Sequence, residues 1–149
     1  IMFRLLIILL VFVLWGAPAI HAQTPPQAST QALPLMSEYR CIKLGMYRNE
    51  VKAIMGKTAR AGMDWDEFKL GGGDLMTARY NDRDAVKTIQ LYFTNPAHAP
   101  AWTVVVGNAE IQRSSNGAKY ARAVNNEENF WVMMFQSKTG AVTTITLSR

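Results

Sequence analysis

Few residues of this chain could carry a reaction at neutral pH. His98 is the only histidine beyond residue 22, and it lies between alanines and prolines in the loop sequence 95–100. Acid–base catalysis needs a group that titrates near neutral pH, and a nucleophile needs a base beside it. No His-x-x-His or Gly-x-Ser-x-Gly spacing accompanies His98. We therefore interpret His98 as a surface-loop residue and predict that the protein is not an enzyme and holds no cofactor or metal.

Two other patterns also imitate functional motifs. Asp64, Asp66 and Glu67 could form a carboxylate pair or part of a calcium loop, but the Asp-x-Asp-x-Asp-Gly spacing of an EF-hand is absent. We expect these three side chains to be solvated charges at the start of a strand. The glycines 71–73 lack the Lys-Ser/Thr that follows a phosphate-binding loop, so we interpret them as a turn.

The net charge and the single cysteine limit the classes of binding partner and the covalent cross-links that we expect. The formal net charge is +5, yet no run of five or six basic residues marks a nucleic-acid-binding arm. We expect no nucleic-acid partner and at most a weak contact with an anionic membrane surface. Cys41 is the only thiol. A buried, inert thiol is the expected state, and an intermolecular disulfide is the alternative.

Aromatic residues give the strongest sign of a binding surface. The segment 130–135 is apolar on both faces of its predicted strand, although one face of an antiparallel sheet is usually polar. Tyr92, Trp102 and Trp131 could form a partner-binding patch of the kind found at protein interfaces, but burial in the core is the preferred interpretation. Core burial suits Trp131 better, whereas an interface suits Tyr92, whose strand face also carries Thr88 and Gln90.

The N-terminus reads as an export signal. Arg4 precedes eleven unbroken apolar residues, 5–15, and small residues lead to a cleavage site after Ala22. We predict a signal peptide at 1–22 and a periplasmic or secreted protein, with an uncleaved membrane anchor as the alternative. Residues 23–34 are uncharged and proline-rich, which is typical of a flexible linker. A single folded domain is expected over 35–149.

Periodicity predicts the elements that must position these residues. A short helical turn is expected over 37–45, and a helix over 48–55 because Val51, Ile54 and Met55 recur at helical spacing. Strands are predicted at 65–70, 75–80, 85–94, 102–106, 120–124, 130–136 and 141–147. The predicted fold is α+β, with short N-terminal helices on one face of an antiparallel meander of six or seven strands.

One internal sequence similarity suggests that part of the chain is duplicated. Residues 85–91 and 141–147 agree at five of seven positions, and each follows a polar turn and a strand. A duplicated unit would place the hairpins 75–94 and 130–147 in equivalent positions. Two strands with similar β-forming composition would also produce this match, and no second copy of the helix motif is visible in the sequence.

The stretch 42–57 resembles the entry motif of the SmpA/OmlA family. The motif residues are Gly45, Met46, Glu50, Val51 and Gly56, while Tyr47 and Thr58 depart from the usual Ser/Thr cap and Pro. The resemblance implies short helices packed on a small antiparallel sheet, similar to the repeats of β-lactamase inhibitory proteins. It also implies a protein-binding role in the cell envelope, such as outer-membrane assembly. We therefore expect an exported, non-enzymatic module that binds an envelope protein; the alternatives are a structural or lipid-facing component acting through its basic surface, or a secreted inhibitor.

Overall fold

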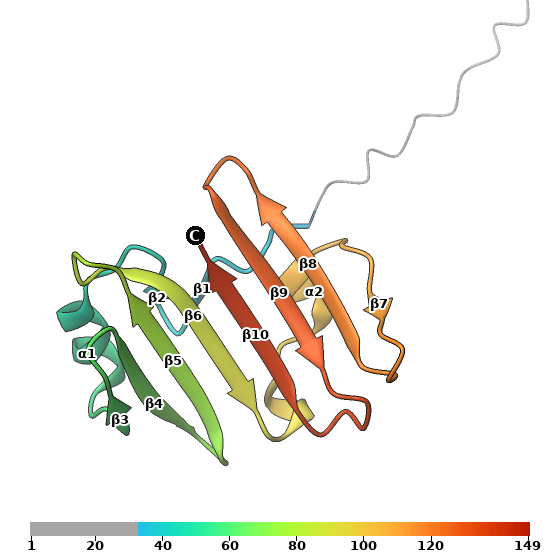
Figure 1. Ribbon diagram of the computed structural model, residues 1–149, viewed down its shortest axis with the longest axis horizontal. Helices are drawn as coiled ribbons and strands as arrows, with labels where there is room; N and C mark the ends of the chain where they lie inside the picture. The colour runs from blue at the N-terminus through green and yellow to red at the C-terminus, as the bar shows by residue number, and fades with distance from the viewer. Residues whose placement is uncertain (1–32) are drawn as a thin grey trace, which may run out of the picture. The chain divides into compact units, whose positions relative to one another are not determined.

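Alternating apolar and polar residues form one antiparallel sheet of eight strands in the computed structural model, which describes residues 33–149 (Figure 1). The strands are β3 (Arg60–Ala61), β4 (Trp65–Gly71), β5 (Asp74–Tyr80), β6 (Val86–Phe93), β7 (Gln112–Arg113), β8 (Lys119–Asn125), β9 (Phe130–Gln136) and β10 (Thr143–Ser148). Across the sheet their order is β3-β4-β5-β6-β10-β9-β8-β7. The predicted signal peptide, 1–22, and most of the predicted linker lie outside the described residues. No helix within 33–149 is long and apolar enough to cross a membrane.

Six predicted strands are confirmed, with ends that differ by at most two residues. The exception is 102–106, which forms the short helix α2 (Trp102–Val106) instead of a strand. Pro100 precedes this segment and Gly107 ends it at a φ of 58°, and both are helix-boundary residues. A β-branched residue lowers helix stability by less than about 1 kcal/mol, which the burial of Val105 and Val106 outweighs.

The sheet has the same arrangement when followed inward from either edge (Figure 1). Each half begins with a two-residue edge strand, continues through three long strands, and is preceded by a short helix that ends at a glycine. The hairpins predicted as equivalent are β5–β6 and β9–β10. The two similar segments, 85–91 and 141–147, form β6 and β10, which pair at the centre of the sheet. Two copies of one unit would give this topology, and the duplication stays a prediction.

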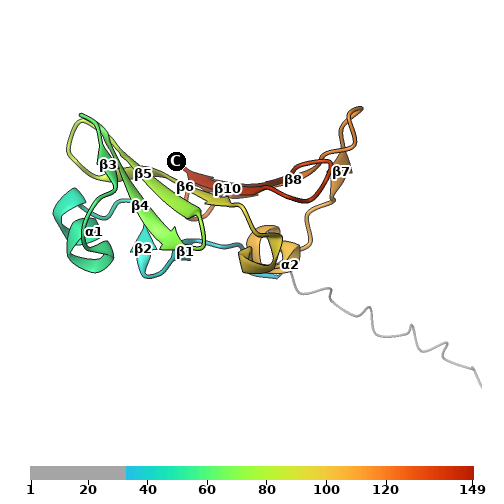
Figure 2. The ribbon, with the colours of Figure 1, turned by 90° about the horizontal axis from the view of Figure 1, so that it is seen from below.

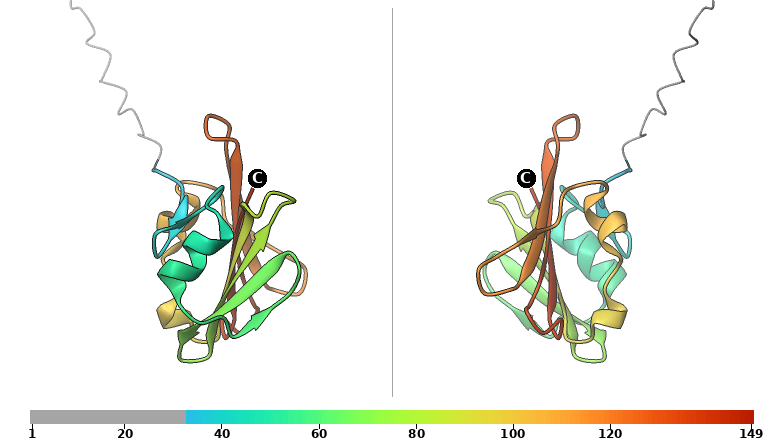
Figure 3. Two further views of the ribbon diagram at one scale, coloured as in Figure 1. Left: turned by 90° about the vertical axis from the view of Figure 1, so that its left-hand side faces the viewer. Right: turned by 90° about the vertical axis from the view of Figure 1, so that its right-hand side faces the viewer.

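All of the remaining elements cover one face of the sheet. Figures 2 and 3 show α1 (Arg48–Met55), α2 and the hairpin of β1 (Glu38–Tyr39) and β2 (Ile42–Lys43) on this side. Helix α2 packs on β8 and β9. The hairpin replaces the helical turn predicted for 37–45. Arg40 and Cys41 both have positive φ angles, 48° and 67°, as a two-residue hairpin turn requires. Cys41 is exposed in that turn, so the prediction of a buried thiol was wrong.

The motif residues of 42–57 join helix α1 to the sheet. The Gly45 N–H donates to the carbonyl of Val86 at 2.7 Å, and the Val86 N–H donates to the carbonyl of Met46 at 2.9 Å. Glu50 accepts the Tyr47 N–H at 2.8 Å, which caps the first turn of α1. Val51 is fully buried, and Gly56 ends the helix at a φ of 76°.

The hydrophobic core lies between the sheet and the elements that cover it. Its buried members come from α1, α2, β2 and the six long strands: Ile42, Val51, Phe68, Met76, Ala78, Tyr80, Val86, Ile89, Leu91, Phe93, Val105, Val106, Ala121, Val132, Met134, Ile145 and Leu147. Strict alternation along 85–94 would place Val86 on the outer face with Thr88, Gln90 and Tyr92. The pairing shifts between Arg79 and Tyr80, so that Arg79 faces Thr88 but Tyr80 faces Val86. This bulge turns Val86 into the core and leaves Lys87 exposed.

Candidate binding surface

The second face of the sheet is left uncovered by every helix and hairpin of the described chain (Figures 2 and 3). We call it the open face. Three residues from each long strand form it: Trp65, Glu67 and Lys69 of β4; Leu75, Thr77 and Arg79 of β5; Thr88, Gln90 and Tyr92 of β6; Thr144, Thr146 and Ser148 of β10; Trp131, Met133 and Phe135 of β9; Tyr120, Arg122 and Val124 of β8. Five of these eighteen residues are aromatic, which makes this face a candidate binding surface.

Strand register brings three of the aromatic residues into one row. Tyr92 of β6 lies opposite Thr144 of β10, Thr144 lies opposite Phe135 of β9, and Phe135 lies opposite Tyr120 of β8. Neighbouring strands are about 4.8 Å apart, so this row crosses the centre of the sheet with only Thr144 between Tyr92 and Phe135. Tyr92 is 40% exposed and Phe135 is 37% exposed. An aqueous protein rarely leaves several large apolar groups together in water unless they bind something.

The predicted partner-binding residues fall on both sides of the sheet. Tyr92 and Trp131 are on the open face, but Trp102 is on α2 and packs against the core from the opposite side. Trp131 is half-buried and outside the core cluster, so the preference for burying it in the core was wrong. The guanidinium of Arg122 lies over its indole ring, 4.9 Å from the ring centre.

Sequence reasoning missed Phe135, Tyr120 and Met133 as surface candidates. The signal was present, because alternate residues of a strand share one face. If Trp131 is on the open face, residues 133 and 135 of the same strand must be on that face too. Which of the two apolar faces of 130–135 meets the helices depends on the complete topology, which the local pattern does not contain.

Of the three acidic residues predicted to be solvated, Asp64 is exposed as expected, but Asp66 and Glu67 are paired and buried, contrary to the prediction. Glu67 is the only acidic residue of the open face, and it accepts two hydrogen bonds from Arg60, both of 2.8 Å. This pairing lowers the pKa of Glu67 below its usual value. Its neighbour Asp66 points the other way, into the core side, and is fully buried.

Asp66 ties helix α1 to the sheet. Arg48 of α1 donates to both carboxylate oxygens, at 2.8 and 2.9 Å, and the hydroxyl of Tyr80 donates at 3.1 Å. Arg48 also donates to the carbonyl oxygens of Met63 and Gly62, at 2.8 and 2.9 Å. Burial alone would raise the pKa of Asp66, but the bonds from Arg48 and Tyr80 outweigh burial and lower it. This cluster is structural, because its hydrogen-bonding groups are satisfied by one another.

His98 is exposed in the loop after β6, as predicted, and it has hydrogen-bonding partners there. Its Nδ1 lies 2.6 Å from the carboxylate of Asp74, and its Nε2 lies 3.3 Å from the amide nitrogen of Asn95. The backbone N–H of Thr94 also donates to Asp74, at 2.8 Å. No hydroxyl or thiol of the described residues hydrogen-bonds to His98, and no cluster of three or more His, Cys, Asp or Glu in 33–149 could hold a metal. The contacts fasten the loop after β6 to the turn before β5.

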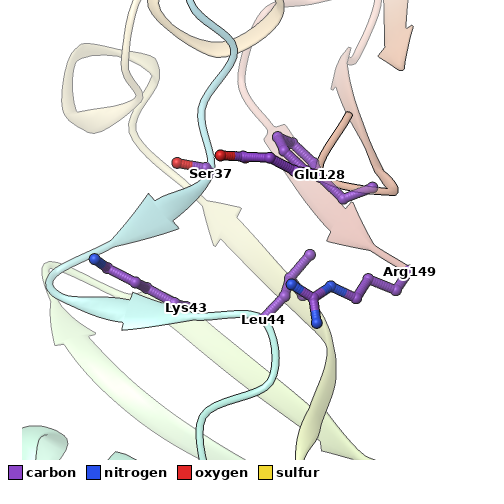
Figure 4. Close-up of a pocket in the computed structure, with 6 residues that line it drawn as sticks. Ser37, Lys43, Leu44, Glu128 and Arg149 are labelled. Carbon is purple, nitrogen blue, oxygen red and sulfur yellow. The ribbon is translucent and has the colours of Figure 1, made fainter. Parts of the chain in front are cut away.

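A separate pocket of about 370 Å³ lies between the N-terminal hairpin and the turn joining β8 to β9 (Figure 4). Its walls carry both charges, with Glu128 on one side and Arg149 on another. Lys43 points away from these groups, and its ammonium pairs with Glu38 at 3.0 Å. Glu128 and Arg149 are exposed and do not converge on a common point, so the open face is the stronger candidate.

Comparison of the chain with protein-family models, curated proteins and solved structures finds no match.

Proposed function

We propose that this protein is an exported, non-enzymatic module that binds another protein of the cell envelope through the open face. The observation that carries the proposal is the row of Tyr92, Phe135 and Tyr120 across a sheet face that the described chain leaves uncovered. Aromatic residues at the centre of an interface supply most of its binding energy, and rigid strands hold them in place before binding.

Two features of the sequence support the remaining parts of the proposal. The apolar segment 5–15 and the small residues up to Ala22 support export. The resemblance of 42–57 to the SmpA/OmlA entry motif supports an envelope role, and short helices on one face of an antiparallel sheet are the fold class that it implies. No hydroxyl or thiol among residues 33–149 hydrogen-bonds to His98, which supports a role other than catalysis.

A lipid-facing role is the second candidate, and the cations of the open face favour it. Attraction of Lys69, Arg79 and Arg122 to anionic headgroups would depend on charge alone, whereas aromatic contacts depend on burial of apolar area. Ionic strength distinguishes the two, because the Debye length falls to about 4 Å at roughly 0.5 M salt. Protein binding should survive this salt concentration, and headgroup binding should be lost.

The proposal is tested by a photo-crosslinking amino acid placed at Tyr92 in cells, with Tyr47 as the matched control position. Tyr47 is 57% exposed at the N-terminus of α1, away from the open face. We expect a protein adduct from position 92 that position 47 does not give. Purified partner should bind Tyr92→Ala about thirtyfold more weakly, because an aromatic anchor contributes roughly 2 kcal/mol.

Thermal melts of the same variants separate binding from folding. Tyr92→Ala should melt within about 2 °C of the wild type, since its side chain is 40% exposed. Trp131→Ala should show a larger shift because its indole is half-buried. A decrease of about 10 °C or more for Tyr92→Ala, or equal adducts from both crosslinking positions, would contradict the proposal.

A further inference from the structure

We propose that the partner presents an acidic, carboxylate-rich protein surface to the open face, an inference that rests on the binding role proposed above. The open face carries three cations, Lys69, Arg79 and Arg122, that form no ion pair within residues 33–149. Its single acid, Glu67, is already neutralised by Arg60. Binding desolvates charged groups, and a buried cation without a counter-charge is costly. The counter-charges must therefore come from the partner.

The positions of the cations describe the shape of the acidic surface. Lys69 lies on β4 and Arg122 on β8, which are five strand spacings or about 24 Å apart. Tyr92 and Phe135 lie between them, on β6 and β9. A partner that covers the aromatic row must place carboxylates at both sides of it. A single acidic residue could not reach both ends, so the complement is a surface or an extended segment.

Arg122 is oriented for carboxylate binding before a partner arrives. Its guanidinium lies over the face of Trp131 at 4.9 Å from the ring centre. The cation–π contact keeps the guanidinium near the ring, and a guanidinium held in this way can still donate two parallel hydrogen bonds to a carboxylate. Arginine restricted in this way loses less conformational freedom when it binds a carboxylate.

The composition of the open face favours a protein over a polyanion without apolar groups. Protein interfaces are enriched in Tyr, Trp, Phe, Met and Arg and depleted in Lys, Glu and Asp. The open face has all five enriched types and only one each of Lys and Glu. Six strands about 4.8 Å apart and about 20 Å long present roughly 600 Å² before side-chain relief is counted, close to the about 800 Å² that each partner contributes to a standard interface.

Neither a second copy nor the N-terminal segment supplies the required charge. Two open faces placed together would bring like-charged residues opposite one another, which opposes association. Residues 1–32 contain Arg4 and neither aspartate nor glutamate. We therefore assign the complementary charge to a different protein.

The test uses a phage-displayed library of random peptides selected against the immobilised mature protein. An open-face charge variant, K69Q/R79Q/R122Q, is compared with the matched variant R83Q/K138Q/R149Q, which removes the same charge from exposed positions elsewhere. The aromatic variant Y92A/F135A reports whether a peptide uses the open face at all. Thermal melts confirm that each variant is folded before its binding is measured.

We expect selected peptides with a net negative charge that lose about tenfold in affinity on the open-face charge variant and less than about twofold on the matched variant. Peptides that need Tyr92 and Phe135 but are neutral or basic would overturn the acidic partner while leaving binding by the open face intact. Selected peptides unaffected by Y92A/F135A, or no selected peptides, would refute both proposals. Binding to phosphatidylcholine vesicles containing phosphatidylglycerol, if lost only in the open-face charge variant, would assign the cations to lipid instead.

Discussion

Asp66→Asn should destabilise the protein far more than the equivalent change at its neighbour Glu67. The two acids are adjacent on β4 and each is paired with an arginine, but Asp66 is fully buried on the core side. Removing one partner of a buried ion pair typically costs about 3–5 kcal/mol, because the other charge stays buried. Arg48 is 20% exposed and keeps its bonds to two carbonyl oxygens, so we expect the lower end, about 3 kcal/mol.

Glu67→Gln provides the matched control. Its partner Arg60 has a side chain that is 68% exposed, so water replaces the lost carboxylate at little cost. Thermal unfolding followed by far-ultraviolet circular dichroism at neutral pH should show a decrease of about 10 °C for Asp66→Asn and a much smaller one for Glu67→Gln. Arg48→Met should be non-additive with Asp66→Asn in a double-mutant cycle. Equal losses at positions 66 and 67 would refute the assignment of Asp66 as the anchor of α1.

Two further predictions concern the pair of His98 with Asp74 and the effect of the buried aspartates on acid stability. His98→Ala should lower the free energy of unfolding by about 1 kcal/mol, because Asp74 keeps its bond from Thr94, and should leave partner binding unchanged; a loss of binding or turnover in this variant would contradict its structural role. Burial alone would raise the pKa values of Asp66 and Asp74, but hydrogen bonds lower them below the ordinary value of 3.8. The unfolded chain therefore binds protons more readily than the folded protein, so the free energy of unfolding should be constant above about pH 4 and decrease below it. The midpoint of urea unfolding should vary less with pH in Asp66→Asn than in the wild type.

The strands could be predicted from local pattern, because a half-buried strand alternates residue by residue whatever lies beyond it. The ends of α1 were predictable for a similar reason, since Glu50 and Gly56 act within one turn of the helix. The strand predicted at 102–106 was wrong because three consecutive valines favour a strand by their composition. Only the complete topology places this segment as a helix that packs on β8 and β9.

The candidate site was only partly predictable. Tyr92 could be placed on an outer face because Thr88 and Gln90 share it. The burial of Asp66 could not be predicted, since its partner Arg48 lies 18 positions earlier and the pair forms only when α1 reaches the sheet. The open face itself depends on which side of the sheet the two helices occupy, and each strand pattern is compatible with either side.

The central position of β10 has a consequence for how the chain acquires its structure during synthesis. It is the last strand in the sequence, yet it lies between β6 and β9. Until it emerges from the ribosome, those two strands are bare edges whose N–H and C=O groups could pair with another chain. The earlier strands can form local hairpins, but the two halves join only when β10 inserts. A nascent chain of this protein therefore exposes the unpaired edges of β6 and β9 until β10 has been made, and a chaperone acting on it would have to shield these two strands first.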